Sequence, residues 1–342
     1  APFDPSKLKL LRPAVPVFED VAIRAATKEP LFSVSTSGTL VYKRASSTST
    51  EAYSLGWIDA TGKRTRLAAV PFSPGNAPAL SHEGTRVASD TEASEVQVLD
   101  VSRQTWNKVT YGDLFHYHPL WGPGDRSLVL GGLQGLYWVR PDGSTRPKIL
   151  IPTPDQSYTV STTADGKLIA FFRILNPSQI WTTTVEERDG ELHASEPVVA
   201  MKQDRLSSTP TLSPDGKWIA YTSDSNGTSE VYVQALPDHG GLWKITEGGG
   251  DWAMFSPKPG ELLFSAHGSL MSVTYTEKAG AFVWEKPKTV IEKLTGRVAA
   301  FAPDTKRVLL LETDRPQGQD STSHQIVLFQ NFLDYLRQRI PI

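Results

Sequence analysis

The sequence predicts an all-β fold: a single seven-bladed β-propeller of four-stranded blades, closed by an N-terminal strand and followed by a short C-terminal helix. The first observation is the stretch 212–236, where the Pro-Asp-Gly turn at 214–216 and a second turn at 224–227 separate apolar runs of strand length. The second is that this unit recurs in degraded form along the whole chain. The third is the interval between its copies.

Each copy places one turn residue just before an apolar strand. These residues are Gly38, Gly84, Gly124, Gly166, Gly216, Gly260 and Thr305. They lie about 44 residues apart on average, and periods of roughly 40–50 residues with four strands each are typical of propeller blades. Seven such blades use nearly the whole chain, so we expect one domain over residues 1–342.

The blades are assigned in chain order from the apolar runs around each turn. Their expected ranges are 31–70, 78–112, 114–152, 156–203, 206–248, 251–294 and 297–330. Residues 13–21 resemble the outer strand that the last blade lacks, so we expect them to pair there and close the ring. A six-bladed ring with accessory strands is the alternative. At the C-terminus, apolar residues on one face of 331–340, after Asn331 as N-cap, predict a short helix packed on the ring.

Composition narrows the classes of partner and site. A net charge of −2 argues against a nucleic acid or an anionic membrane held by bulk electrostatics. The absence of cysteine excludes disulfides and thiolate metal sites. There is no apolar run of membrane-spanning length and no signal peptide at the start. Because the chain begins with Ala, we expect a processed product or part of a longer protein, and we expect a monomer without a cofactor.

The loops between blades lie on the same face of a propeller as the turns that join the second and third strands of each blade. We therefore expect the binding face to be built from these loops. The candidate residues on it are Tyr111, Asp113, His116, His118, Asp155, Tyr158, Asp204, Arg205, Asp251 and Trp252. Asp residues inside the blade turns are assigned to turn structure alone. These are Asp125, Asp165, Asp215 and Asp304.

Two patterns within this face suggest chemistry. His116 and His118 alternate, so in a regular strand they would point to the same side, and with Asp113 they could hold part of a divalent metal site. The four acids that recur at similar points of consecutive repeats could favour a cation at a channel mouth. In both cases, hydrogen bonding within the loops is the simpler interpretation.

The repeats resemble WD40-like, TolB-type propeller repeats, whose signature is SPDG before an apolar strand. The run 212–256, the opening APFDP and the ending IVLFQNFLDYLRQRIP resemble the C-terminal propeller region of acidobacterial-type serine/threonine protein kinases. That resemblance implies a sensor attached to a kinase and favours an extracytoplasmic location. Kinase activity is not implied, because the chain has no Gly-rich nucleotide loop, HRD or DFG motif.

The expected function is therefore a non-catalytic module that binds a protein, a small molecule or a carbohydrate at the loop face. It would be the sensor or interaction part of a larger bacterial signalling protein. No G-x-S-x-G elbow for a hydrolase nucleophile occurs. The alternative is a metal-dependent, lyase-like carbohydrate-active propeller enzyme that uses His116 and His118.

Overall fold

A computed structural model describes residues 3–4, 6–10, 17–18, 21–22, 30–44, 53–75, 78–111, 115–173, 178–203, 210–236, 240–313 and 326–339. The chain divides into two compact units, one from Ala52 to Asp314 and the other from Ala1–Glu51 with Arg315–Ile342. Apart from one helix, the described secondary structure consists of strands and a 3-10 turn. This confirms the predicted all-β class.

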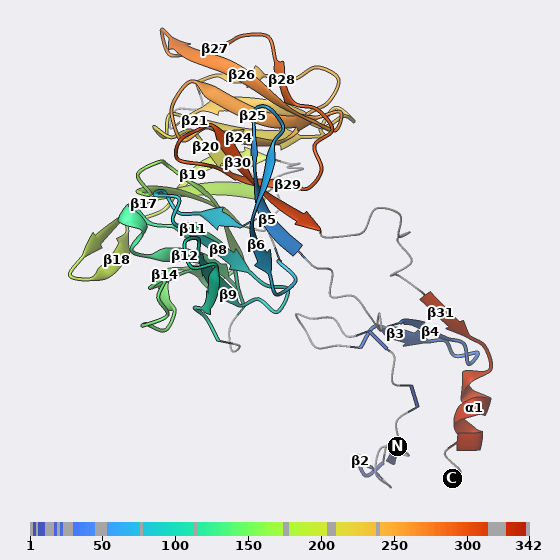
Figure 1. Ribbon diagram of the computed structural model, residues 1–342. Helices are drawn as coiled ribbons and strands as arrows, with labels where there is room; N and C mark the ends of the chain where they lie inside the picture. The colour runs from blue at the N-terminus through green and yellow to red at the C-terminus, as the bar shows by residue number, and fades with distance from the viewer. Residues whose placement is uncertain are drawn as a thin grey trace. The chain divides into compact units, whose positions relative to one another are not determined.

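Within Ala52–Asp314, the described strands form six antiparallel groups of four, in a nearly continuous succession (Figure 1). In chain order, the first group is β7–β10 (Ala79–Leu80, Arg86–Asp90, Val96–Asp100, Thr105–Lys108) and the second is β11–β14 (His116–Trp121, Leu128–Gly132, Gly135–Val139, Lys148–Pro152). The third is β15, β16, β17 and β19 (Ser157–Thr162, Leu168–Arg173, Ser178–Arg188, Val198–Gln203), and the fourth is β20–β23 (Thr211–Leu212, Trp218–Ser223, Glu230–Ala235, Leu242–Lys244). The fifth is β24, β25, β26 and β28 (Asp251–Phe255, Glu261–Ala266, Ser269–Lys278, Lys288–Ile291). The sixth is β29, β30, β5 and β6 (Arg297–Phe301, Arg307–Thr313, Tyr53–Asp59, Arg64–Val70). β18 (Glu191–Ala194) and β27 (Ala281–Trp284) extend β17 and β26, and η1 (Pro123–Asp125) is the 3-10 turn before β12.

Six apolar clusters join each sheet to the next and the last sheet back to the first. Representative pairs across these contacts are Leu55 with Val87, Val98 with Trp121, Val129 with Phe171, Ile180 with Tyr221, Val233 with Phe255, and Leu263 with Leu310. The central strands are buried on both faces because each face packs on a neighbouring sheet; β21 is buried along its whole length. The succession of sheets is therefore closed, as in a propeller.

The predicted turns have the backbone conformation that their residues favour. All seven turn residues have positive φ, from 59° at Thr305 to 112° at Gly260. In five turns of the ring, the amide at the start donates to the carbonyl of the residue that opens the next strand, as Ser213 does to Trp218; in the turn before β12, Gly122 donates to Ser127, one residue before the strand. The repeated motif is thus a structural device that reverses the chain between the first and second strands of each sheet.

Strand pairing differs from the prediction in the first and the last of the predicted blades. We expected β5 and β6 to complete a blade with residues 31–45, but β5 pairs with β30 from Tyr53↔Thr313 to Asp59↔Arg307. The strands expected in the blades at 31–70 and 297–330 thus contribute to one shared sheet. The predicted closing strand 13–21 lies outside the described residues except for 17–18 and 21.

The other unit contains the copy of the motif that the ring does not use. β3 (Phe32–Val34) and β4 (Leu40–Lys43) form its hairpin, and β31 (Ile326–Phe329) pairs with β4. The predicted C-terminal helix is α1 (Phe332–Arg339), and it packs on this sheet through Phe332, which clusters with Leu40 and Tyr42. A separate two-stranded pair is formed by β1 (Phe3–Asp4) and β2 (Lys9–Leu10).

The β5–β30 pairing can be tested with a disulfide, because the chain has no cysteine of its own. Ser54 and Glu312 are direct cross-strand partners, and such pairs lie within disulfide range. Ser54→Cys with Glu312→Cys should form an intramolecular disulfide on mild oxidation, visible as increased mobility on non-reducing gels and a raised Tm. As a control, Ser54→Cys with Glu191→Cys, whose second site lies on another sheet, should keep both thiols free. Two free thiols in the first variant would contradict the pairing.

Candidate binding channel and its loop-side mouth

The first strands of the six sheets, β7, β11, β15, β20, β24 and β29, surround two adjoining cavities. One, of about 280 Å³, lies at the end where the repeated turns are and is lined by residues such as His82, Trp121 and Thr163. The other, of about 230 Å³, lies at the loop end and is lined by His118, Trp252 and Arg297 among others. We call them the turn-side cavity and the loop-side cavity.

The two cavities share a ring of six residues, one from each first strand. These are Ala79, Leu120, Val160, Thr211, Met254 and Ala299. All but Thr211 are apolar. The ring therefore forms a mostly apolar waist between two more polar ends of one central channel.

His118, which lines the loop-side cavity, belongs to an aromatic cluster on β11 and β15. The rings of Tyr117 and Tyr158 stack with centroids 4.9 Å apart, and His118 meets Tyr158 edge-on at 5.4 Å. The Gln156 amide donates to the Tyr117 hydroxyl. Burial raises the pKa of Tyr117, so its hydroxyl stays protonated at neutral pH. The predicted residues His118 and Tyr158 thus meet here.

His116 and His118 do not share a side of β11, contrary to the prediction. The pairing of β11 with β12 shifts between Tyr117 and Leu120, and His118 has a φ of 51°, so a bulge breaks the regular alternation. His116 is buried against Tyr137, with ring centroids 5.0 Å apart, whereas His118 lines the channel. Both imidazole nitrogens of His116 are buried and have no hydrogen-bond partner among the residues that the structure describes.

The surroundings of each histidine lower its pKa. Burial lowers the pKa of His116 to about 4. For His118, burial is the main cause of a lowered pKa; the nearby Arg297 adds to it, and the Asp90 carboxylate opposes it. Both imidazoles are therefore neutral at neutral pH.

The remaining predicted residues lie at different places. Trp252, on a backbone with φ of 53°, lines the loop-side cavity and is 47% exposed. Asp251 instead lines a neighbouring glycine-rich cavity of about 440 Å³. Asp155 pairs with Arg173 at 2.8 Å, and Tyr111 is exposed beneath the ammonium of Lys108. Asp113, Asp204 and Arg205 lie outside the described residues.

The described residues do not provide a complete set of metal ligands. Among the described residues, no group of three or more His, Asp or Glu side chains is arranged to hold a metal ion. The separation of His116 from His118 by the bulge explains why these two do not combine.

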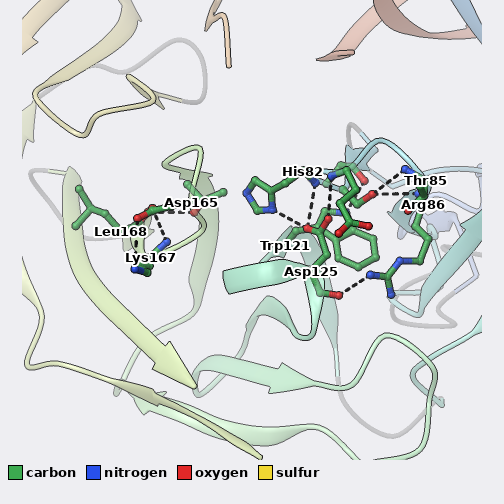
Figure 2. A network of polar contacts seen from close by, with 12 residues as sticks. His82, Thr85, Arg86, Trp121, Asp125, Asp165, Lys167 and Leu168 are labelled. Carbon is green, nitrogen blue, oxygen red and sulfur yellow. Dashed lines mark hydrogen bonds and ion pairs between the residues drawn. The ribbon is translucent and has the colours of Figure 1, made fainter. Parts of the chain in front are cut away.

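At the turn-side end, Asp125 links two neighbouring sheets (Figure 2). Its carboxylate accepts the backbone N–H groups of His82 and Glu83, each at 3.0 Å, and its Oδ1 lies 2.6 Å from Nδ1 of His82. The Arg86 guanidinium donates to the Asp125 carbonyl and covers the ring of Trp121 at 4.5 Å. Asp125 was assigned to turn structure alone, but it also joins the turn after β7 to the turn after β11.

The pKa values of this pair are shifted in opposite directions. Burial by itself would lower the pKa of His82, but the hydrogen bond and charge of Asp125 outweigh it and raise that pKa. Burial would raise the pKa of Asp125, but its bonds to His82 and Glu83 lower it. The charged pair is therefore the stable form in mildly acidic solution.

Sequence reasoning missed Arg297 and the His82–Asp125 pair. Arg297 opens β29 as Asp251 opens β24, and each stands five residues before the amide that begins the next turn (Ala302 and Ser256), so the position between repeats that made Asp251 a candidate also points to Arg297. The link from Asp125 to His82 had no local signal because it joins residues 43 positions apart.

No protein-family model matches the chain, and no curated protein matches it in sequence. Solved structures do match. A putative TolB from Agrobacterium tumefaciens aligns with a TM-score of 0.59 and 15% identity, over 78% of this chain and 100% of that chain. TolB from Acinetobacter baumannii aligns with a TM-score of 0.41 and 15% identity, over 81% of this chain and 65% of that one. An oligogalacturonate lyase in complex with manganese gives a TM-score of 0.47 and 11% identity, over 88% and 81%.

The likeness to the putative TolB shows the fold, that of a TolB-type β-propeller. At this level of identity it says nothing of activity or ligand. In the described part of the chain, no helix has the length and apolar character needed to cross a membrane.

The buried His116 makes stability fall on acidification. Its folded pKa, about 4, lies below the ordinary 6.5, so its contribution is complete above pH 6.5 and is lost as the pH falls toward 4. Between pH 7.5 and 4.5, the wild type should lose about 2 kcal/mol more unfolding free energy than His116→Phe. Urea denaturation at the two pH values measures this. Equal losses in both proteins would show that the pKa of His116 is the same in the folded and the unfolded protein.

The contribution of the His82–Asp125 pair to the free energy of unfolding should, in contrast, fall as the pH rises on the basic side of its range. Its contribution is complete between the ordinary values of 3.8 and 6.5 and is lost as the pH rises through the raised pKa of His82. His82→Gln should cost about 1–3 kcal/mol of unfolding free energy at pH 5.5 and less at pH 8.5. The exposed His193→Gln is the matched control and should change neither value. A cost for His82→Gln that does not vary with pH would contradict a charged pair.

Proposed function

We propose that this chain is a non-catalytic binding module whose protein or small-molecule ligand meets the loop-side mouth of the channel. The observation that carries the proposal is Trp252, a large aromatic side chain left 47% exposed on the rim of a cavity. Arg297 lines the same cavity, and Tyr158 contacts His118, which also lines it. Trp, Tyr and Arg are the residue types that supply most binding energy at protein interfaces.

The rim is also preorganised. The bulge at Trp252 is bonded locally, because the Trp252 N–H donates to Asp251 Oδ1 at 2.8 Å and the Ser265 hydroxyl donates to the Asp251 carbonyl at 3.0 Å. Stacking and the Gln156 bond hold the Tyr117–Tyr158 pair in the same way. Side chains held before a ligand arrives lose less conformational entropy on binding, which favours recognition.

The wider role in the proposal rests on the resemblance of the sequence to kinase-associated propellers. We infer that the module is the sensor or interaction part of a larger bacterial signalling protein and works outside the cytoplasm. The TolB-type fold is compatible with this role. The alternative of a metal-dependent, lyase-like enzyme would need ligands beyond the described residues, such as Asp113.

Site-specific photo-crosslinking tests the binding face. A benzophenone amino acid at Trp252, in the full-length protein within its own cells, should give a discrete crosslinked adduct. The matched control position is Leu242, which is 58% exposed on β23, away from both channel cavities. The partner or ligand identified in the adduct should bind purified Trp252→Ala with an affinity weaker by about 2 kcal/mol or more, roughly 30-fold. Adducts no stronger at 252 than at 242 would refute the proposed face.

A further inference from the structure

Arg297 is the one Lys, Arg, Asp or Glu among the described residues that line the loop-side cavity. It opens β29 and is half-buried. The rest of the wall is made of apolar side chains, neutral hydroxyls, Trp252 and His118. Three of its backbone positions are prolines, which have no N–H to donate: Pro78, Pro119 and Pro210.

Within the described part of the chain, Arg297 has no ion pair or hydrogen bond, unlike other partly buried arginines. Arg64 pairs with Glu312, Arg140 with Glu187 and Arg173 with Asp155. A guanidinium carries five N–H donors in a planar fork, and leaving them unmatched beside a partly enclosed cavity has a cost in free energy. An anionic ligand in the cavity would supply the missing partner.

The polar groups around His118, which lines the same cavity as Arg297, already have hydrogen-bond partners. Asp90, whose charge is felt at His118, is itself buried and accepts the His118 N–H at 3.3 Å. The Thr159 hydroxyl donates to the His118 carbonyl. His118 is neutral at neutral pH, so it does not add a second cation to the cavity wall.

The size and composition of the cavity limit the anion. The volume of about 230 Å³ ends at the mostly apolar waist, so a small planar group with a short apolar extension fits best. A single guanidinium matches a carboxylate in a two-pronged contact. A phosphate site would normally gather several donors, such as a helix N-terminus or a lysine, and the cavity wall holds neither among its described residues.

We propose that Arg297 anchors a carboxylate group in the loop-side cavity, with Trp252 at its rim. The proposal rests on the binding function proposed above and names the chemistry of the ligand. The carboxylate could belong to a free small organic acid or to an acidic side chain of a protein segment. The chemistry is the same in both cases, and the experiment separates the two sources.

The test follows the arginine Nε–H and tryptophan Nε1–H signals of the full chain by NMR. Arg297→Gln assigns the arginine signal, and Trp252→Phe assigns the indole. Sodium acetate at constant ionic strength should shift both signals saturably, with a Kd in the millimolar range typical of one such contact. Acetamide, which has the same shape without the charge, should shift neither. Arg297→Gln should weaken acetate binding at least ten-fold, as read from the indole, whereas Arg103→Gln, on an exposed arginine of the turn after β9, should leave it unchanged.

Two further titrations identify the source. The capped peptide Gly-Asp-Gly, compared with capped Gly-Asn-Gly, should bind more tightly than acetate if the carboxylate belongs to a protein segment. Equal or weaker binding of the peptide supports a free acid. Equal shifts with acetate and acetamide, or unchanged acetate binding by Arg297→Gln, would overturn the carboxylate site. The crosslinking result at Trp252 is independent of this outcome, so the binding function can stand if the carboxylate site fails.

Discussion

Packing between neighbouring sheets is the interaction on which the rest of the structure depends. Each sheet has two apolar faces and is buried only when a sheet lies on both sides of it. A linear array would leave its first and last faces in water. The contact between β25 and the β5–β30 pair removes both faces at once, through residues such as Leu263 and Leu310. Closure is therefore required by the burial pattern of the strands.

The same constraint produces the candidate site. Because the sheets are arranged around a centre, their first strands converge and their polar ends collect at two mouths. No local feature of β29 or β11 brings Arg297 near His118; both line the loop-side cavity because each lies toward the loop-side end of the first strand of its sheet. Bulges in β11 and β24, where side chains no longer alternate between the two faces of the strand, turn His118 and Trp252 toward the channel region. Binding side chains and structural irregularities thus coincide, as is common at functional sites.

How much the sequence could predict depends on the range of the interactions involved. The seven turns were predicted correctly because Pro, Asp and Gly act within four residues. The pairing of β5 with β30 was not predicted, because all copies share one apolar pattern and β5 could complete a sheet with several partners. The side chain of His116 was placed wrongly with that of His118 because a bulge cannot be read from alternation. Arg297 could have been found, since its offset from the turn is that of Asp251.

The waist of the channel has a consequence for how such a protein can change. Each of its six residues comes from a different repeat. None of them is among the buried residues of the six apolar clusters that join neighbouring sheets. Thr211 belongs to none of these clusters, so a substitution there would alter the bore without disturbing the packing that closes the ring. Duplicated repeats can therefore diverge one position at a time, so that an architecture with near-symmetric parts acquires an asymmetric passage and a distinct selectivity.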